Sequence, residues 1–345
     1  MKIVIANNMV PFLWGGAEEL AANLAKRIRG RGHEVELLRL PFKWEPFSCL
    51  PLEMLVARSL EVTNADHLIA LKFPAYLIPH VSKTLWLLHQ YRQAYDLFES
   101  EYSNLPATPE GADVRSLIRE ADNLAFRESK KIFTNSEVTS DRLLRYNGFA
   151  SIALHPPLND AELFTGGESR GYIFAGGRIN GMKRQELLVR ALAKTPSNVR
   201  LIVAGPAESE SDGENLLQLA EKLDVSDRLE LLIGFHSREK IADLVNHSIA
   251  CAYIPFDEDS LGYVSMEAVE AGKPVITTSD SGGVQRLVRD GSSGWVVAPD
   301  ADALALAMSR AVSSATRSRA MGKAARHEWR DMKITWDDTL DRLVP

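Results

Sequence analysis

The sequence predicts an α/β protein built from two Rossmann-like, doubly wound domains. Short apolar runs recur along the chain with helical or irregular segments between them, as in a parallel sheet that helices cover on both faces. The series of runs starts a second time near residue 171, and 345 residues are enough for two domains that each bury a core.

The first series begins with IVIA at residues 3–6 and continues with RGHEVELLRL, HLIALK and TLWLLH. Gly15 and Gly16 follow the first run and precede a helix rich in Ala and Leu. Such a pair lets the backbone approach a phosphate closely, although it is more often an ordinary turn. His89 ends the TLWLLH run, at the edge of the sheet where ligands bind, and a plain structural role is the commoner one there.

A linker is predicted after Pro156 and Pro157, where GGESRG follows, so we place the domains at residues 1–165 and 166–325. The second series contains GYIFAGGR, RLIVAGP, RLELLIGF, ACAYIP and PVITTS. Gly205 and Phe235 follow strand ends in this series. They are candidates to frame a nucleotide base, with simple packing as the alternative.

The most informative stretch spans residues 253–286. An acidic loop at residues 257–259 follows a buried strand, Gly262 opens a short helix, and a Gly and a Pro end that helix before the next strand. Ligands of such βαβ units lie at the carboxyl ends of the strands, and the open N–H groups of the helix suit a pyrophosphate. Glu267, just over one turn inside, can reach a hydroxylated group beside that anion.

Two cations stand at the start of the second series. Arg178 follows its first strand, and Lys183 opens the next helix five residues on. Two cations that face a dianion give charge-assisted hydrogen bonds, which strengthen as a leaving group gains charge. Solvated charges are the commoner role of Arg and Lys.

These residues resemble the retaining GT-B glycosyltransferases of family four, the glycosyl transferases group 1. Asp259 and Glu267 look like the E-x7-E signature of that family, with an Asp in the first position, and Arg178 with Lys183 looks like its G-R-x4-K pair. The family has a Glu three residues after the Gly-Gly turn, whereas this chain has Arg286. The resemblance covers nearly the whole chain, although its specific residues lie mainly in 171–295.

The resemblance implies two domains that face a cleft, with the acceptor on the N-terminal side and the donor on the C-terminal side. Residues 326–345 are expected to form a helix that crosses back to the N-terminal domain. The implied reaction moves a sugar from a nucleoside diphosphate sugar, UDP or GDP being expected, to a hydroxyl of a sugar or lipid-linked glycan. It retains the anomeric configuration, needs no metal or other cofactor, and serves bacterial-type polysaccharide or glycoconjugate synthesis.

The family's functional positions carry over to two groups of residues. Arg178 and Lys183 are expected to hold the phosphates, Glu267 the ribose, and His89 to face the donor sugar. The expected catalytic residues are His89, Arg178, Lys183 and Asp259. The expected donor-binding residues are Gly15, Gly16, Gly205, Phe235, Ser260, Leu261, Gly262, Tyr263 and Glu267. None of them is expected to bind a metal.

Composition narrows the function classes. A net charge of −6 argues against nucleic-acid binding, which needs a strongly basic face. No apolar run approaches the roughly 18 residues of a membrane span, and the N-terminus has no signal-peptide pattern, so we expect a cytoplasmic protein. A basic cluster in the N-terminal domain would suit a peripheral contact with anionic lipid at the inner face of the membrane if the acceptor is lipid-linked, but solvated helix ends are the commoner explanation. Its members are Lys26, Arg27, Arg29, Arg31 and Arg39.

Three alternatives remain open. A glycosidase would use Asp259 and Glu267 as its two carboxylates, but it has no need of Arg178 and Lys183. A metal-dependent transferase would use residues 257–259 as a D-x-D motif, although such a triplet is more often a solvated loop. A non-catalytic nucleotide-sugar-binding protein on the same fold would be consistent with the shorter Asp259.

Overall fold

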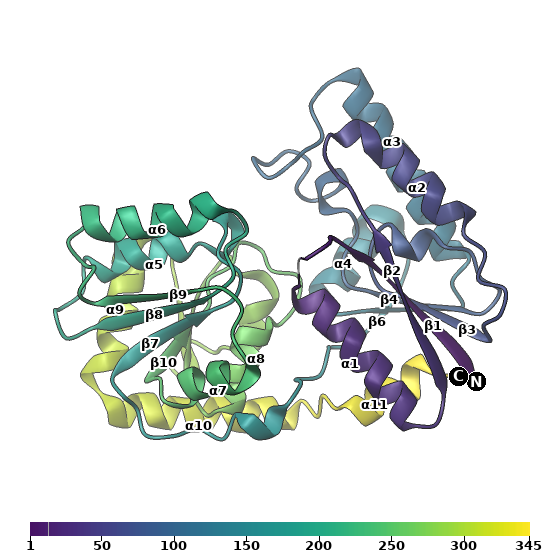
Figure 1. The fold of residues 1–345 in the computed structure, drawn as a ribbon. Coiled ribbons are helices and arrows are strands. Elements are labelled where there is room, and N and C mark those ends of the chain that lie inside the picture. The colour runs from purple at the N-terminus through teal and green to yellow at the C-terminus, as the bar shows by residue number, and fades with distance from the viewer. Residues whose placement is uncertain (13) are drawn as a thin grey trace. The chain divides into compact units, whose positions relative to one another are not determined.

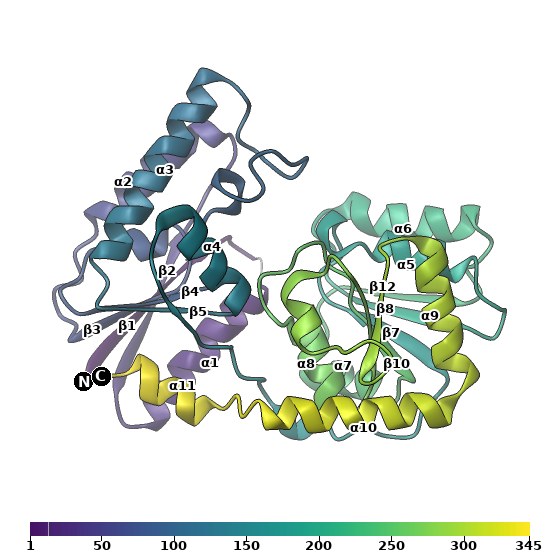
Figure 2. The ribbon, with the colours of Figure 1, turned by 180° about the vertical axis from the view of Figure 1, so that it is seen from behind.

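The computed structural model describes residues 1–12 and 14–345 of the chain. It divides into two compact α/β units, which Figures 1 and 2 show from opposite sides. The first unit contains Met1–Pro157 and Thr335–Pro345, and the second contains Leu158–Ile334. The sequence places the division between residues 165 and 166 instead. Leu158 and Phe164 belong to the second unit because their side chains are buried in its core.

The first unit holds a six-stranded parallel sheet in the order β2-β1-β3-β4-β5-β6. Its strands are β1 (Lys2–Met9), β2 (Glu34–Pro41), β3 (His67–Ala70), β4 (Lys83–Leu87), β5 (Lys131–Thr134) and β6 (Ile152–Ala153). Its helices are α1 (Gly16–Gly30), α2 (Leu50–Ser59), α3 (Pro109–Arg127), α4 (Glu137–Asn147) and α11 (Trp336–Leu343).

The second unit holds another six-stranded parallel sheet, in the order β12-β11-β10-β7-β8-β9. Its strands are β7 (Tyr172–Gly176), β8 (Arg200–Gly205), β9 (Leu229–Ile233), β10 (Ala250–Ala252), β11 (Val275–Thr278) and β12 (Gly294–Val297). Its helices are α5 (Gln185–Leu192), α6 (Glu210–Lys222), α7 (Arg238–Asn246), α8 (Tyr263–Glu270), α9 (Ala301–Ser313) and α10 (Ala315–Asp331).

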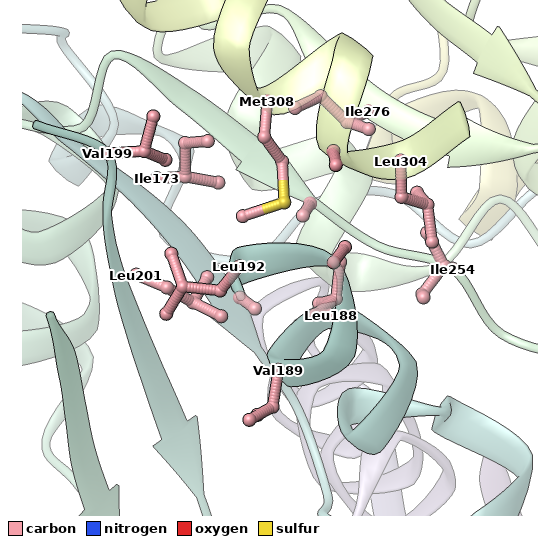
Figure 3. Close-up of a cluster of buried hydrophobic side chains, with 14 of the residues drawn as sticks. Ile173, Leu188, Val189, Leu192, Val199, Leu201, Ile254, Ile276, Leu304 and Met308 are labelled. Carbon is pink, nitrogen blue, oxygen red and sulfur yellow. The ribbon is translucent and has the colours of Figure 1, made fainter. Parts of the chain in front are cut away.

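Burial on both faces explains why the strands of these sheets are continuous apolar runs. All five residues of β7 are buried, and so are all three of β10. On one face, Ile173 of β7 and Ile276 of β11 pack with Leu188 of α5 and with Leu304 and Met308 of α9 (Figure 3). The predicted α/β architecture of two doubly wound sheets is therefore confirmed.

Each sheet has one strand at which the chain order reverses. In the second unit, β7 is paired with β8 on one side and with β10 on the other, so the connections after β7 and β10 leave the sheet in opposite directions. In the first unit, β1 has the same place between β2 and β3. Ligands of doubly wound sheets bind at the carboxyl ends of these strands.

The C-terminal segment, residues 326–345, forms parts of two helices where the sequence predicts one. Helix α10 ends at Asp331, and Thr335 caps α11 by accepting a hydrogen bond from the backbone of Asp338 at 3.2 Å. Leu340 of α11 is buried in the core that also holds Leu24 of α1. Helix α11 therefore packs in the first unit, whereas α10 belongs to the second.

The basic cluster of the N-terminal half is largely engaged inside the first unit. Arg31 forms ion pairs with Asp337 and Asp341 of α11. Arg29 donates to the carbonyl of Val35 at 2.6 Å, Arg27 lies over the ring of Trp336, and Arg39 lies over that of Trp14. These contacts give four of the five cations a structural role.

Within residues 1–12 and 14–345, no helix has the length and hydropathy needed to cross a bilayer.

Candidate active site

Lys183 is the best-defined cation of the candidate site. It lies between β7 and α5, and its ammonium group donates to the Tyr253 hydroxyl at 2.9 Å and pairs with the carboxylate of Glu258. Burial alone would lower the pKa of Lys183. The carboxylate and the hydroxyl outweigh burial, so the pKa is raised and the side chain stays a cation.

Arg178 lies five residues earlier, after the turn at Gly177. Its guanidinium is 3.5 Å from the carboxylate of Glu208, and about a third of the side chain is exposed. The side-chain amide of Gln185 donates to its carbonyl at 2.9 Å, which fixes the backbone between β7 and α5. The guanidinium thus keeps surface through which a ligand can reach it.

Arg184 was not identified from the sequence, although it holds the loops of the site together. Its guanidinium donates to the carbonyls of Ile254 and Pro255 at 2.8 Å and forms two 2.8 Å hydrogen bonds to Asp280. Its backbone has φ of 56°, the left-handed conformation that costs a non-glycine residue energy. These bonds tie the connection after β7 to those after β10 and β11.

Tyr253 joins Lys183 to the start of α8. Its hydroxyl accepts from Lys183 and donates to Glu258 at 2.9 Å, and burial followed by the Glu258 charge raises its pKa. Its ring lies against Gly262, the N-cap residue of α8, where a Cβ atom would be 2.4 Å from Cε1 of the ring. Gly262 also has φ of 74°, so both the space and the backbone conformation require glycine.

The acidic triplet at residues 257–259 is not the solvated loop that such a pattern usually indicates. Glu258 pairs with Lys183, and Asp259 is only 7% exposed. The loop backbone lies directly on the turn at Gly282 and Gly283, because the amide of Gly283 donates to the carbonyl of Glu258 at 2.8 Å. A Cβ at either glycine would lie within 2.6 Å of this loop's backbone, which explains the Gly-Gly pair.

The four residues predicted to meet the donor at the helix start are adjacent in the structure. Ser260, Leu261 and Gly262 lead into α8, and Tyr263 is its first residue. No side chain of the described chain caps this end of the helix. The Oγ of Ser260 accepts from the amide of Gly262 at 3.3 Å, but Gly262 is the N-cap residue and precedes the first turn. The backbone N–H groups of the first turn of α8 therefore have no side-chain acceptor in the described chain, as an anion site requires.

Glu267 is 5% exposed and forms an ion pair with Arg238 at 2.5 Å. Arg238 is the first residue of α7, and it also donates to the carbonyl of Asn159 at 3.3 Å and lies over the ring of Phe164. Because these contacts hold the guanidinium, they fix the direction of the Glu267 carboxylate. No local sequence pattern indicates this arrangement, since Arg238 precedes Glu267 by 29 positions.

Gly205 is the last residue of β8, and Phe235 lies two residues beyond β9, at the same edge of the sheet as Arg178. Gly205 has φ of 152°, and a Cβ there would be 2.1 Å from the carbonyl oxygen of Gly177, so close packing of two backbones accounts for the glycine. Phe235 is 61% exposed. Contact of either residue with a nucleotide base stays a prediction.

The remaining predicted residues lie in the first unit. Gly15 caps α1, and its amide donates to the carboxylate of Glu18 at 2.9 Å, while Gly16 is the first helical residue. His89 lies two residues beyond the end of β4, and its Nδ1 is 2.6 Å from the carbonyl oxygen of Gln90. Because a carbonyl only accepts, Nδ1 carries the proton and Nε2 presents a lone pair.

We expect the His89 imidazole to stay neutral down to about pH 4. Burial, and then the nearby cations Lys72 and Arg92, lower its pKa to about 3. An imidazole NMR titration checks this, with His327, whose side chain is 80% exposed, as the internal control. A His89 midpoint near the ordinary value of about 6.5 would contradict the prediction.

The same shift has a consequence for stability. The charged imidazole is disfavoured in the folded state, so the His89 contribution is complete above about pH 6.5 and is lost as the pH falls toward 3. Urea unfolding should therefore show a smaller acid-dependent loss in His89→Gln than in the wild type, whereas His327→Gln should behave like the wild type.

In residues 1–12 and 14–345, no three His, Cys, Asp or Glu side chains gather where they could hold an ion.

A stretch in the second half of the chain matches a known protein family. Residues 165–328 match the model of the glycosyl transferases group 1. Over 177 residues the chain is 36% identical to D-inositol 3-phosphate glycosyltransferase of Mycobacterium marinum, a match that covers 49% of this chain and 36% of that protein. It is also 28% identical over 238 residues to the D-inositol 3-phosphate glycosyltransferase of Mycolicibacterium smegmatis. That match covers 63% of this chain and 52% of the relative. The chain thus spans about half or less of the length of these relatives.

Solved structures extend the likeness to the whole fold. HepE of Anabaena in complex with UDP and glucose superimposes with a TM-score of 0.72 at 20% identity, covering 99% of this chain and 100% of that one. Sucrose-phosphate synthase from Thermosynechococcus elongatus gives 0.78 at 18% identity, over 99% and 96% of the two chains. WaaG, a glycosyltransferase involved in lipopolysaccharide biosynthesis, gives 0.77 at 18% identity over all of both chains. The predicted GT-B fold and the resemblance to the glycosyl transferases group 1 are confirmed.

Proposed function

We propose that this chain is a glycosyltransferase that moves a sugar from a nucleoside diphosphate sugar to an acceptor hydroxyl. The observation that carries the proposal is the arrangement at the carboxyl ends of β7 and β10. Lys183 is joined through Tyr253 to Gly262, so a fixed cation lies beside an uncapped helix start. Both features suit a diphosphate that gains negative charge as the sugar leaves.

The donor would lie along the second unit. Arg178 and Lys183 would bind the diphosphate, and the backbone of residues 260–263 would bind the phosphates or the sugar beside it. Glu267, oriented by Arg238, would accept hydrogen bonds from the ribose hydroxyls. UDP-sugars are the first donors to consider, because solved structures of HepE contain UDP-glucose or UDP with glucose.

Catalysis would then consist of positioning and charge stabilisation. Retention of the anomeric configuration and independence from metal ions belong to the proposal. His89, with its free lone pair on Nε2, would accept a hydrogen bond from a donor-sugar hydroxyl. The acceptor would be a sugar or a lipid-linked glycan, in polysaccharide or glycoconjugate synthesis.

A non-catalytic role is the less favoured reading, because the named relatives are glycosyltransferases. Turnover distinguishes the two. Release of nucleoside diphosphate that depends on an acceptor supports the enzyme. Donor binding without transfer or hydrolysis would contradict it.

The first experiment is a thermal-shift screen against UDP-, GDP-, ADP-, CMP- and dTDP-sugars, each with and without EDTA. We expect one nucleotide class to raise Tm by roughly 5 °C near saturation, with no effect of EDTA. Glu267→Gln should remove most of the shift, while Glu214→Gln, a change at an exposed position of α6, should keep it.

Two results would count against the proposal. A shift that disappears with EDTA would contradict the metal-free site. The absence of a shift with every nucleotide would contradict the donor class itself. The configuration of the product, read from its anomeric proton coupling by NMR, tests retention separately.

A further inference from the structure

A second cluster of cations lies at the opposite edge of the second unit's sheet. It surrounds a cavity of about 230 Å³ next to Ile249 and Pro274, the residues that precede β10 and β11. Four cationic residues line this cavity, and no Asp or Glu is among the described residues around it. We refer to Lys273, Arg319, Lys323 and Arg326 as the cationic pocket.

Lys273 is the unusual member of the cationic pocket. It is 8% exposed, and its ammonium group donates to the carbonyl of Gly167 at 2.9 Å. No carboxylate of the described chain lies within ion-pair distance of it. Burial lowers its pKa; the nearby Cys251 opposes that shift, and the charge of Arg319 adds to it. Buried lysines are nearly always paired, because an uncompensated buried charge is costly.

The other three cations come from one face of α10. Arg319, Lys323 and Arg326 are spaced by four and three residues, so they lie above one another on the helix. Arg319 and Lys323 have no ion pair within the described chain. Arg326 reaches Glu270 at 3.3 Å with one nitrogen, but its buried Nε has no hydrogen-bond partner in that part of the chain.

The backbone holds this cluster in place. Helix α10 packs so closely on the turn before β11 that a Cβ at Gly322 would be 1.9 Å from the carbonyl oxygen of Gly272. The same turn carries Lys273, and Figures 1 and 2 show α10 running along this edge of the unit. The carboxyl end of α8, at Glu270, favours one cation nearby, but it does not account for three more around one cavity.

We propose that the cationic pocket binds a small anion that carries phosphate. Four cations converge on it, and one of them is a buried ammonium group whose charge nothing in the described chain neutralises. The volume is below the roughly 300–1,000 Å³ of sites for drug-sized ligands, which favours an inorganic phosphate, a pyrophosphate or a small phosphate ester. This site lies at the edge of the sheet opposite the proposed donor site, and it does not depend on that function.

Isothermal titration of the whole chain with pyrophosphate, orthophosphate and glucose 6-phosphate tests the proposal at fixed ionic strength. Because the proposed donor site also attracts phosphate, the titration is repeated with Arg178→Ala, which should keep the binding at the cationic pocket. Arg319→Ala/Lys323→Ala should weaken it about a hundredfold, roughly tenfold for each lost charged contact. Arg317→Ala, on the same helix but outside the cavity lining, should change the affinity less than twofold.

The three anions distinguish the source of the phosphate. Tighter binding of glucose 6-phosphate supports a phosphate ester as the ligand, and tighter binding of the inorganic ions supports a free phosphate or pyrophosphate. Equal affinity in Arg319→Ala/Lys323→Ala and Arg317→Ala would overturn the proposal, as would the absence of binding at millimolar anion.

Lys273→Met gives an independent measurement. It removes an uncompensated buried charge while keeping most of the side-chain volume, so Tm in anion-free buffer should stay the same or rise. With Arg178→Ala present in both proteins, so that the proposed donor site is weakened, pyrophosphate should raise Tm when Lys273 is kept and should no longer raise it in Lys273→Met. A lower Tm together with an unchanged pyrophosphate effect would mean that Lys273 only caps the backbone, and would contradict its place in an anion site.

Discussion

Lys183→Met should lower kcat/KM for sugar transfer by about a thousandfold, the upper range for loss of one group that stabilises a developing anion. The pKa of Lys183 is raised by its partners, so the wild type presents a full positive charge at every pH of interest. Methionine keeps the length of the stem and removes only that charge. The rate of nucleoside diphosphate release, with the donor that the thermal-shift screen identifies, measures the effect.

Two controls separate catalysis from folding. Lys194→Met removes an exposed lysine of the same unit that pairs with Asp302 at 2.7 Å, and it should leave the rate unchanged. Lys183→Met also leaves the Glu258 carboxylate without its cation, which by itself could disturb the loop. The double variant with Glu258→Gln removes that charge, and we expect its activity to stay low. Recovery of activity there would mean that the loss is structural.

The sheets could be predicted because a parallel strand that is buried on both faces consists of a continuous run of apolar residues. Residues 172–176 and 250–252 show this, and every position in them is buried. The break between α10 and α11 could not be predicted in the same way. Both helices carry apolar stripes, and the two stripes differ in the core that they join. Leu340 of α11 is buried in a core of the first unit, and Ala325 of α10 is buried in a core of the second.

The residues of the candidate site also differ in whether a local sequence pattern could predict them. Arg178, Lys183, Gly262 and Glu267 could be found because strand ends and helix starts are local features, and the structure places them all at one edge of one sheet. Arg184 could not, because its partner Asp280 lies 96 positions away and no local pattern pairs them.

The contacts of the acidic triplet could not be predicted for the same reason. Composition does not show that the ammonium group of Lys183 forms an ion pair with Glu258, which lies 75 positions away. Asp259 is buried next to the Gly-Gly turn, so its side chain, which is shorter than that of the Glu in the family signature, is packed against neighbouring residues. Its role toward the donor stays a prediction.

Gly262→Ala should both destabilise the second unit and abolish donor binding. The positive φ of 74° alone costs an alanine about 1–3 kcal/mol, and the new Cβ would also overlap the Tyr253 ring at 2.4 Å. Either the ring or the start of α8 has to move. A shift of the helix start would misdirect the N–H groups that are proposed to meet the diphosphate.

Gly291→Ala is the matched control for this substitution. It lies in the same unit and has the same φ of 74°, but no atom lies within 4 Å of its new Cβ. It should show the conformational cost alone in urea unfolding, with donor binding unchanged in the thermal-shift assay. Equal destabilisation and equal donor binding in the two variants would mean that the contact with Tyr253 has no influence on the helix start.

A double variant shows whether the ring is the cause. Tyr253→Ala removes the atoms that the new Cβ meets, so adding it to Gly262→Ala should cost less than the sum of the two single changes. The cost of the positive φ at residue 262 remains in the double variant, so Tyr253→Ala should restore only part of the stability lost in Gly262→Ala. Donor binding should not return, because Tyr253 also holds Lys183, and that bond is lost with the ring. Strictly additive free energies of unfolding would contradict a direct steric link between Tyr253 and the start of α8.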